Sequence, residues 1–435
     1  MKEIKSFYVY TYGCQMNELD SAVMIGQLMK RGLVMVDNEN LADLLIFNTC
    51  SVRDLAERKV MGKIGQLGRK TKRKQIIGVT GCMAMSKKET LFSKLPNISF
   101  VLGTNNINDL NAVLDDVLNE GGHVIHTDKD FGEDIDFLSA QREDKIKAYV
   151  SIIRGCDKRC TYCIVPYTRG KEVSRPPQDI LDEVEYLVRC GYKEITLLGQ
   201  NVNSYGKDRP EWNCLFHDLL YRLDKTGVKR IRFLTSHPVD IKIELIEAIR
   251  DLPSVCKFVH FPMQGGSDRI LRKMHRIYTK EEYQEKVALL REIIPNVALG
   301  TDIIVGFPTE TDEEFQETYD IFKKNDYSIA FIYTYSARKG TPAYRWEDDV
   351  PEQIKEVRLQ KLLQLHNDQC IERHKKMLGE TTKVLIERRN KNNFLKGRND
   401  KWDKVVINGS DSLIGTIQDV KIHTFNHQTL IGSLI

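Results

Sequence analysis

The feature that most constrains this chain is a group of three cysteines within a single loop. Cys156, Cys160 and Cys163 follow an apolar run at residues 148–153, which we interpret as a β-strand. Iron–sulfur clusters are held by cysteine thiolates, and a four-iron cubane normally takes four of them. Three close cysteines therefore predict a [4Fe-4S] cluster with one iron open to an outside ligand. Zinc is the alternative, but a structural zinc site needs a fourth Cys or His, and none follows nearby.

A second set of cysteines is spread over the N-terminal third, where three apolar runs end in Cys14, Cys50 and Cys82. Helix-like stretches at residues 18–31 and 56–68 separate these runs, and the alternation predicts a parallel sheet. Ligands of such sheets bind beyond the carboxyl ends of the strands. We therefore expect the three thiols to converge on a second [4Fe-4S] cluster; three unrelated buried thiols are the alternative. The other cysteines are interpreted as structural, namely Cys190, Cys214, Cys256 and Cys370.

Composition and charge narrow the class of protein. The 435 residues are 41% hydrophobic, which predicts two to four domains. Ten cysteines are too few for a disulfide scaffold in a chain of this length. No run approaches 18 apolar residues, and the first residues enter a strand pattern directly. We therefore expect a cytoplasmic protein with no membrane partner. The net charge is +4, but residues 371–404 carry eleven Lys or Arg against five acids, which favours a nucleic-acid partner.

The central part of the chain alternates strand-like and helix-like runs. Six strands are expected, at residues 148–153, 195–198, 231–234, 257–261, 298–305 and 330–335. Helices are expected between them at residues 178–190, 240–250, 280–294 and 310–324. Six such units predict a (βα)6 partial barrel, with the loops after the strands lining the active site. Those loops span residues 199–203, 235–238, 262–267 and 306–310.

The C-terminal part begins with an amphipathic helix at residues 351–377 and then changes to short strands. We place the strands at residues 382–386, 405–407, 415–422 and 429–432, punctuated by Gly, Asn and Asp as in a small antiparallel β-barrel. Phe394 and Trp402 lie in the basic stretch. Aromatic side chains stack on nucleic-acid bases, so both are candidate contacts, with a buried core role as the alternative.

Several motifs together resemble one known family. The cluster loop, with Tyr162 before its last cysteine, resembles that of radical S-adenosylmethionine (SAM) enzymes. The sequences Tyr-Gly-Cys-Gln-Met-Asn at residues 12–17, Asn-Thr-Cys-Ser-Val-Arg at residues 48–53 and Gly-Cys at residues 81–82 resemble the N-terminal domain of the methylthiotransferases. The Gln-Met-Asn form is similar to the bacterial tRNA-modifying branch of that family, and the resemblance covers essentially the whole chain.

The resemblance implies a fold and a domain plan. It implies an N-terminal flavodoxin-like parallel α/β domain, a radical SAM partial TIM barrel and a C-terminal OB-like TRAM barrel. The boundaries that we expect are residues 1–122, a linker at 123–141, the core at 142–373 and the TRAM domain at 374–435. Gln-Gly-Gly-Ser at residues 264–267 departs from the Gln-Ser-Gly-Ser common in the family, which removes any side-chain role at Gly265.

The resemblance also implies chemistry. Two [4Fe-4S] clusters and SAM would methylthiolate carbon 2 of N6-dimethylallyladenosine at position 37 of tRNA. The implied cluster ligands are Cys156, Cys160 and Cys163 for the radical-generating cluster and Cys14, Cys50 and Cys82 for the sulfur-donating one. The implied SAM-binding residues are Tyr162, Gly199, Gln200 and Asn201, with no side chain acting as an acid–base catalyst. The implied partners are the tRNA anticodon stem-loop and an electron donor such as flavodoxin or ferredoxin. The enzyme itself is expected to be a monomer.

Alternatives remain for the function and for several polar residues. The two alternative functions are methylthiolation of a ribosomal protein and non-catalytic sensing by an iron–sulfur protein that binds RNA. Six basic side chains lie in or near the cluster loop, namely Arg154, Lys158, Arg159, Arg169, Lys171 and Arg175. One interpretation is that they bind phosphate or the SAM carboxylate, and the other is that they are solvated. Three histidines are interpreted as structural, namely His237, His260 and His275.

Overall fold

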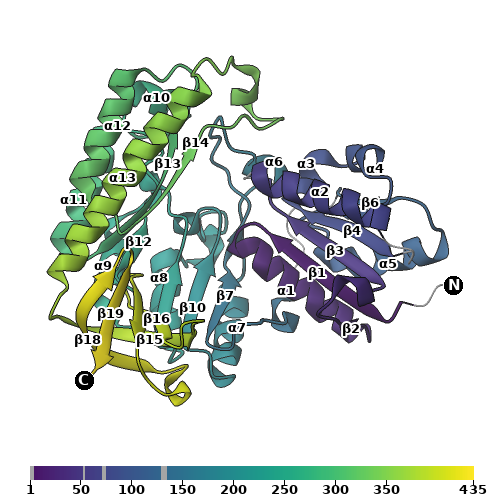
Figure 1. Ribbon diagram of the computed structural model, residues 1–435, viewed down its shortest axis with the longest axis horizontal. Helices are drawn as coiled ribbons and strands as arrows, with labels where there is room; N and C mark the ends of the chain where they lie inside the picture. Colours follow the sequence, from purple (N-terminus) through teal and green to yellow (C-terminus); the bar gives the residue numbers. More distant parts are fainter. Residues whose placement is uncertain (1–3, 52–53, 71–74, 129–134) are drawn as a thin grey trace.

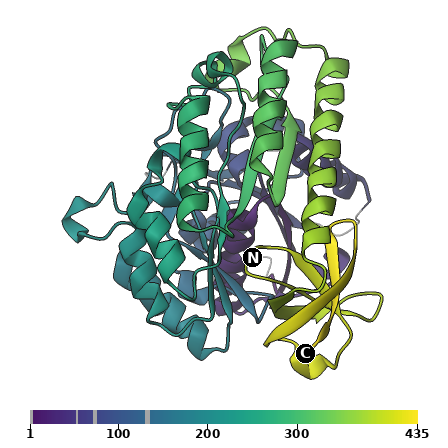
Figure 2. The ribbon, with the colours of Figure 1, turned by 90° about the vertical axis from the view of Figure 1, so that its left-hand side faces the viewer.

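The computed structural model describes residues 4–51, 54–70, 75–128 and 135–435. Three folded parts follow one another along the chain (Figure 1): an N-terminal α/β domain, a central half-barrel of strands and helices, and a small β-barrel at the C-terminus. The N-terminal domain lies on one side of the central part, and the C-terminal barrel lies below it (Figures 1 and 2). The predicted fold class is confirmed in all three parts.

The N-terminal domain is built on a parallel sheet, with strand order β2-β1-β3-β4-β5-β6 over the described residues. Its strands are β1 (Ser6–Tyr12), β2 (Val34–Met35), β3 (Leu44–Thr49), β4 (Ile76–Gly81), β5 (Phe100–Leu102) and β6 (Val124–His126). Every residue of β3 and β4 is buried, as expected for central parallel strands covered on both faces. The order reverses between β1 and β3, which is where flavodoxin-like sheets bind their ligands. Strand β6 falls within the predicted linker, so the sheet extends beyond residue 122.

Helices cover both faces of this sheet. One hydrophobic core lies beneath α1 and α5, and another lies beneath α2, α3 and α4. The helices are α1 (Gln15–Lys30), α2 (Asp54–Lys70), α3 (Cys82–Lys87), α4 (Thr90–Lys94) and α5 (Leu110–Asn119). The two predicted helices correspond to α1 and α2. Helix α1 is buried on most sides, because it packs against the sheet on one side and against the central domain on the other.

The central domain has the six predicted parallel strands, which the structure arranges as two three-stranded sheets. They are β7 (Lys147–Ser151), β10 (Glu194–Leu198), β11 (Arg230–Phe233), β12 (Phe258–His260), β13 (Ala298–Val305) and β14 (Ile329–Thr334). A parallel bridge between Ile231 and Val255 links the two halves. The outer helices are α7 (Pro177–Arg189), α8 (Phe216–Asp224), α9 (Ile243–Asp251), α11 (Lys280–Ile293) and α12 (Asp312–Asn325). Shorter elements complete this domain, namely β8 (Ile153–Arg154), α6 (Val165–Thr168), β9 (Val173–Ser174) and α10 (Asp268–Lys273).

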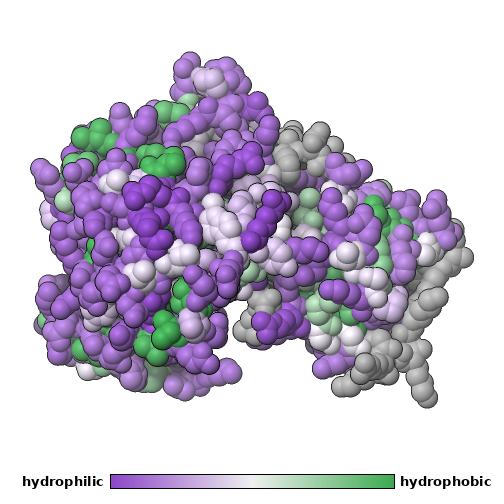
Figure 3. Space-filling view, turned by 90° about the horizontal axis from the view of Figure 1, so that it is seen from above, coloured by the Kyte–Doolittle hydropathy of each residue, from purple (hydrophilic) through white to green (hydrophobic). Residues whose placement is uncertain are grey.

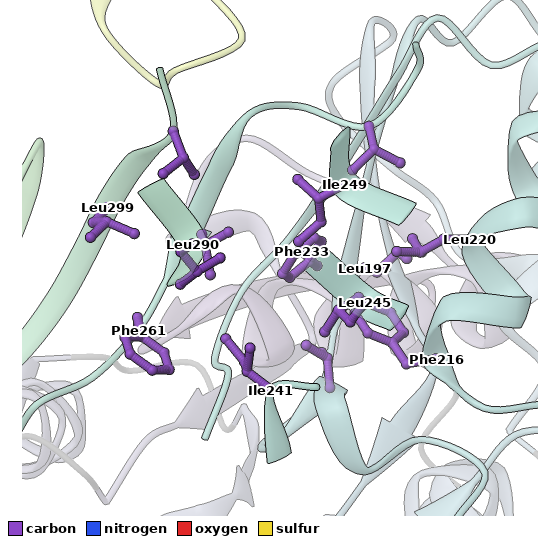
Figure 4. Close-up of a cluster of buried hydrophobic side chains, with 14 of the residues drawn as sticks. Leu197, Phe216, Leu220, Phe233, Ile241, Leu245, Ile249, Phe261, Leu290 and Leu299 are labelled. Atoms are coloured by element: carbon purple, nitrogen blue, oxygen red, sulfur yellow. The ribbon is translucent and has the colours of Figure 1, made fainter. Parts of the chain in front are cut away.

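The main hydrophobic core lies between these strands and their outer helices. Figure 4 shows Leu197 and Phe233 from the strands against Phe216, Leu220 and Leu245 from the helices. Side chains alternate across a strand, so the strand residues next to these core positions face the interior of the half-barrel. Asp302 and Phe331, which pair in register, are on this inner face, and Phe331 is 43% exposed. The half-barrel therefore keeps an accessible interior.

The C-terminal part begins with α13 (Glu352–Lys376) and closes into a barrel with strand order β15-β16-β17-β19-β18. Its strands are β15 (Thr381–Arg389), β16 (Leu395–Arg398), β17 (Lys404–Ile407), β18 (Ile417–Asn426) and β19 (Thr429–Leu434). Two features differ from the sequence prediction. Strand β16 reads Leu-Lys-Gly-Arg and carries too little apolar signal to be recognised. The pair β17–β19 is parallel rather than antiparallel.

Two buried arginines join the C-terminal barrel to the amino ends of the central strands. Arg230 donates hydrogen bonds to the carbonyl oxygens of Arg398 and Lys383, both at 2.7 Å. Arg232 donates to the carbonyl of Asp400 at 2.9 Å, and its guanidinium lies 4.8 Å from the centre of the Trp402 ring. Trp402, a predicted candidate for RNA contact, is thus occupied in a domain interface.

The face of the molecule seen from above is mainly polar, and the hydrophobic residues on it form small separate patches (Figure 3). Across the described residues, none of the helices combines the length and the apolar character needed to span a bilayer.

Candidate functional site

The three cysteines of the central loop lie between β8 and α6, directly beyond the carboxyl end of β7. The loop begins with Gly155, whose φ of +77° belongs to the left-handed region, and a Cβ there would lie 1.8 Å from the carbonyl oxygen of Lys171. Glycine permits this close crossing at little steric cost. The amide of Cys156 then donates to the Gly170 carbonyl at 2.9 Å, which ties the start of the loop to its exit.

The middle of the loop is held by the segment that follows α10. Thr161 donates from its amide to the Met274 carbonyl at 3.1 Å and from its hydroxyl to the Lys273 carbonyl at 2.8 Å. Nη1 of Arg276 lies 3.4 Å from Sγ of Cys160. Arg276 is only 7% exposed. A buried guanidinium therefore sits in direct contact with one predicted cluster ligand.

The thiols of this loop are buried donors that ionise only with a cation beside them. Burial raises the pKa of both Cys156 and Cys163 to about 12, so a bound cation must supply the charge that ionises them. Within the described residues, no three Cys, His, Asp or Glu side chains come together tightly enough to ligate one metal ion. Each thiolate of a cubane binds a different iron, so its ligands stand further apart. The set of three thiol donors fits a [4Fe-4S] cluster with one iron left for an outside ligand.

The N-terminal cysteines converge at the carboxyl edge of the first sheet. Cys14 follows β1, Cys50 follows β3, and Cys82 is the first residue of α3 directly after β4. The backbones of the first two come so close that a Cβ on Gly13 would lie 2.6 Å from Cβ of Cys50. These positions flank the β1–β3 switch point, as the alternation of strands and helices predicts.

Electrostatics link these thiols to the central domain. A hydrogen bond from Cys50 lowers the pKa of Cys14 to about 5, with further help from the charge of Arg169. Burial opposes the charge of Arg169 itself, but Cys82, Asp20 and Cys14 together overcome that effect and raise its pKa. The three N-terminal thiols and Arg169 of the central domain thus form one electrostatic group.

The bridge between the two domains is a buried carboxylate that the sequence did not reveal. Asp20 on α1 is 2% exposed and accepts hydrogen bonds from Arg154 and Arg169, both at 3.0 Å. Thr104 adds a hydrogen bond from its hydroxyl to the Thr168 carbonyl at 2.6 Å. The helices α3 and α6 meet at the same junction (Figure 1). These contacts bring the two cysteine sets to opposite sides of one domain interface.

The predicted SAM-binding residues occupy the carboxyl ends of the central strands. Gly199 leaves no room for a side chain, because a Cβ would lie 2.4 Å from Cγ2 of Ile153. Oε1 of Gln200 is buried without a hydrogen-bond partner, as are both amide atoms of Asn203 and the hydroxyl of Ser236. Buried polar atoms are normally paired. This group of unpaired atoms at the barrel mouth, all within the described part of the chain, fits a polar ligand such as SAM.

Asn201 and Tyr162 have partners within the protein. The side chain of Asn201 accepts from the His237 amide at 3.1 Å and donates to Asp240 at 2.7 Å. The ring of Tyr162 packs edge-on against Phe307, and burial raises its pKa. Both side chains shape the site. Any contact that they make with SAM is left as a prediction.

Asp240 is a second functional candidate that the sequence prediction missed. It binds Lys158 of the cluster loop at 3.0 Å and Lys207 at 2.6 Å. Burial opposes ionisation of Asp240, but hydrogen bonds from Lys207, Asn201 and Lys158 overcome it and hold the pKa below the usual range. The sequence suggested it only as the first residue of the helix expected at residues 240–250, where an acidic side chain is common for helix stability alone. The structure places it at the end of a short 3-10 turn, Pro238–Asp240.

Comparisons with known protein families match this arrangement along the chain. Residues 6–103 match "Uncharacterized protein family UPF0004", residues 150–322 match the Radical SAM superfamily, and residues 375–435 match the TRAM domain. Among solved structures, the radical SAM methyltransferase TsrM from Kitasatospora setae has a TM-score of 0.58 at 13% identity, covering 79% of this chain and 74% of that one. The cobalamin-dependent SAM radical enzyme OxsB has a TM-score of 0.53 at 12% identity, covering 83% and 55%. At these identities the likeness concerns the fold alone.

Two curated relatives match over nearly their whole length. A tRNA-2-methylthio-N(6)-dimethylallyladenosine synthase of Protochlamydia amoebophila (strain UWE25) is 65% identical over 437 residues, covering 100% of this chain and 97% of the relative. The protein of the same name from Thermoanaerobacter pseudethanolicus (strain ATCC 33223 / 39E) is 46% identical, covering 99% and 92%. With the radical SAM half-barrel and the cysteine-bearing junction described above, this similarity shows that the chain belongs to the tRNA-2-methylthio-N(6)-dimethylallyladenosine synthase family of radical SAM enzymes.

Proposed function

We propose that this enzyme methylthiolates carbon 2 of N6-dimethylallyladenosine at position 37 of tRNA. Its full-length relatives are named for that product, and it contains a radical SAM domain together with a TRAM domain. These two domains suit a radical reaction carried out on RNA. The base at position 37 lies in the anticodon loop, where unstacked bases can enter an active site without opening a duplex.

The observation that carries this proposal is the meeting of two cysteine sets at one domain junction. Asp20 lies on the helix that begins beside Cys14, and its two arginine partners lie on either side of the central cluster loop. This arrangement supports two clusters that act on one substrate atom. The proposed ligands are Cys156, Cys160 and Cys163 for the radical-generating cluster and Cys14, Cys50 and Cys82 for the sulfur-donating cluster.

The residues of the chain have distinct roles in this proposal. When bound, the clusters and SAM supply the radical, the sulfur and the methyl group. Gln200, Asn203 and Ser236 offer buried hydrogen-bonding atoms to SAM. Arg276 donates a hydrogen bond to a ligand sulfur, and Asp20 keeps the two domains at a constant separation. None of these side chains has to exchange a proton with the substrate.

The proposed partners follow from the same reaction. The anticodon stem-loop of tRNA binds across the central domain and the basic C-terminal barrel, where Phe394 is 36% exposed and free to stack on a base. A small electron donor such as flavodoxin or ferredoxin reduces the cluster. The enzyme acts as a monomer in the cytoplasm, as proposed from its sequence.

Two other functions are less well supported. The TRAM domain and the Gln-Met-Asn sequence after Cys14 favour an RNA substrate over a ribosomal protein. The unpaired polar atoms around the barrel mouth favour an enzyme over an iron–sulfur sensor, because a sensor has no need of hydrogen-bonding groups for SAM.

Mass spectrometry of tRNA nucleosides tests the proposed function. Deleting the gene should abolish 2-methylthio-N6-dimethylallyladenosine, and restoring the gene should return it. Cys14→Ala and Cys156→Ala should each fail to restore the nucleoside, because each removes one proposed cluster ligand. Cys190→Ala is the matched control, since Cys190 is exposed and lies outside both cysteine sets.

Two outcomes would contradict the proposal. An unchanged nucleoside in the deletion strain would exclude this tRNA substrate, and ribosomal proteins would be examined next for methylthiolation. Full restoration by Cys14→Ala would instead reject the N-terminal cluster while leaving the substrate assignment intact.

A further inference from the structure

A cavity of about 160 Å³ with a mixed polar and apolar lining lies beside the domain junction. It is lined mainly by the β8–β9 ribbon, by the start of α7 and by the loop that contains Trp212. Its cationic lining residues are Arg154, Arg169, Lys171, Arg175 and Arg209. Pockets that hold whole cofactors measure roughly 300–1,000 Å³. This cavity is therefore suited to a small group such as a phosphate rather than to a second cofactor.

The charge of the cavity favours an anion. Among the described residues, its lining holds five cationic side chains and one carboxylate, Asp179. Three carboxylates that approach the lining are shared between donors. Asp20 serves Arg154 and Arg169, and Glu183 serves Arg175 and Arg142. Asp208 lies 3.9 Å from Arg209 and also accepts hydrogen bonds from Ser174. Each shared carboxylate neutralises only part of the charge around it, so the cavity keeps an excess of positive charge.

Two buried donors at the cavity lack partners among the described residues. Nη1 of Arg169 makes no hydrogen bond although Arg169 is only 3% exposed, and Nδ2 of Asn105 is unpaired as well. An unpaired buried charged donor is costly. An anion in the cavity would satisfy both donors, and arginine binds phosphate oxygens especially well because its N–H groups form a planar fork.

The cavity also has an aromatic wall. Trp212 lines it, with the Arg209 guanidinium 5.9 Å from the centre of the indole ring. Aromatic rings next to cationic side chains form the stacking platforms of single-stranded nucleic-acid sites. Phosphate contacts and base stacking together are features of an RNA site and are not needed to bind a free inorganic anion.

We propose that this cavity binds a backbone phosphodiester of the substrate RNA while Trp212 stacks on an adjacent base. This inference rests on the proposed function, because it takes RNA as the substrate. The cavity adjoins Arg154, two residues before Cys156, so an RNA held there is anchored close to the reacting centre. Its role is to fix the register of the anticodon loop, separately from the contacts made by the C-terminal barrel.

Binding of a fluorescent anticodon stem-loop to the cluster-reconstituted enzyme tests the inference. Lys171→Gln and Arg209→Gln should each weaken binding about fivefold and reduce the slope of log affinity against log salt by about 0.7 to 0.9, the share of one phosphate contact. Lys225→Gln is the charge-matched control, because Lys225 is exposed and follows α8 at the opposite, amino end of the strands. It should leave both quantities unchanged.

Tryptophan fluorescence provides an independent readout. RNA should quench the emission of the wild type, and Trp212→Phe should remove a large part of that quenching, since only three tryptophans are present. Unchanged affinity and unchanged salt slope in both charge variants would overturn the inference, even if the wild type still binds RNA and forms the methylthio product. If the wild type binds no RNA at all, the proposed function fails together with the cavity.

Discussion

Arg276 is a buried cation in direct contact with a proposed cluster ligand. Besides Sγ of Cys160, its guanidinium binds the hydroxyl of Tyr278 at 3.1 Å and the carbonyl of Pro262 at 3.4 Å. Hydrogen bonds to ligand sulfurs and burial are among the main factors that set the potential of an iron–sulfur cluster. Arg276 is therefore positioned to tune how readily the cluster accepts an electron.

Replacing Arg276 should change that potential. We expect Arg276→Met to lower the midpoint by about 40 mV, the equivalent of one hydrogen bond of about 1 kcal/mol to the reduced cluster. A redox titration followed by electron paramagnetic resonance measures the shift. Arg276→Lys keeps the charge and should recover part of it. An unchanged potential in Arg276→Met with an intact cluster signal would show that the contact is only structural.

His237 offers a test based on pH. Burial, with the charges of Arg276 and Lys158, lowers its pKa to about 2, so it stays neutral in the folded protein while the unfolded chain titrates near 6.5. The unfolded state therefore binds the extra proton below pH 6.5, and stability falls as the pH is lowered. His237 alone should lower the free energy of unfolding by about 2 kcal/mol between pH 6.5 and pH 5.

Chemical denaturation at both pH values measures this effect. His237→Gln should lose about 2 kcal/mol less than the wild type on going from pH 6.5 to pH 5. His217→Gln is a control, because His217 lies on the outer helix α8, away from the site. Equal acid sensitivity of the wild type and His237→Gln would mean that His237 becomes protonated within the fold.

At the scale of elements, the junction depends on how α1 meets the cluster loop. The carboxylate of Asp20 is the common acceptor for two arginines of the central domain. Removing one partner of a buried ion pair leaves an uncompensated charge, which usually costs about 3–5 kcal/mol. The position of the N-terminal sheet against the half-barrel therefore depends strongly on one side chain.

Asp20→Asn tests this dependence. We expect it to destabilise the protein by about 3 kcal/mol and to abolish methylthiolation even when all six proposed ligands are present. Asp115→Asn breaks the surface pair with Arg31, in which Asp115 is 56% exposed, and should cost less than about 1 kcal/mol. Wild-type stability and activity in Asp20→Asn would show that the domains are held by other contacts.

At the scale of the whole molecule, the C-terminal barrel is docked on the central strands and leaves Phe394 partly exposed. Trp402 lies between Arg232 and Arg398 and 5.1 Å from Phe258, which fixes the barrel to the amino ends of the central strands. Phe394 remains outside this interface. The two aromatic residues of the basic stretch therefore have separate roles.

Substitution should separate these roles. Trp402→Ala should lower stability and make the chain near residue 377 sensitive to protease, because the barrel loses its anchor. Phe394→Ala should leave stability unchanged and weaken anticodon stem-loop binding about fivefold, as expected for one lost stacking contact. Denaturation, limited proteolysis and fluorescence anisotropy check the two variants side by side. If Phe394→Ala binds RNA normally, the barrel uses another surface.

The sequence by itself determined the strands of the central domain, most of its outer helices and the two cysteine sets. Residues 148–153 and 298–305 could be identified as strands because their side chains follow a local period, and the cysteine spacing of the central loop is equally local. The convergence of Cys14, Cys50 and Cys82 was also predictable, since the carboxyl ends of parallel strands share one edge.

Tertiary structure decided the residues that connect these parts. Asp20 meets its arginines across 134 and 149 residues, and Arg276 meets Cys160 across 116. The sequence left Trp402 open between an RNA contact and a buried role, and the fold placed it against Arg232. No local period encodes such contacts, because they depend on where whole domains dock. The residue types that carry the chemistry of the site could therefore be predicted from the sequence. Their arrangement around one domain junction depends on long-range packing.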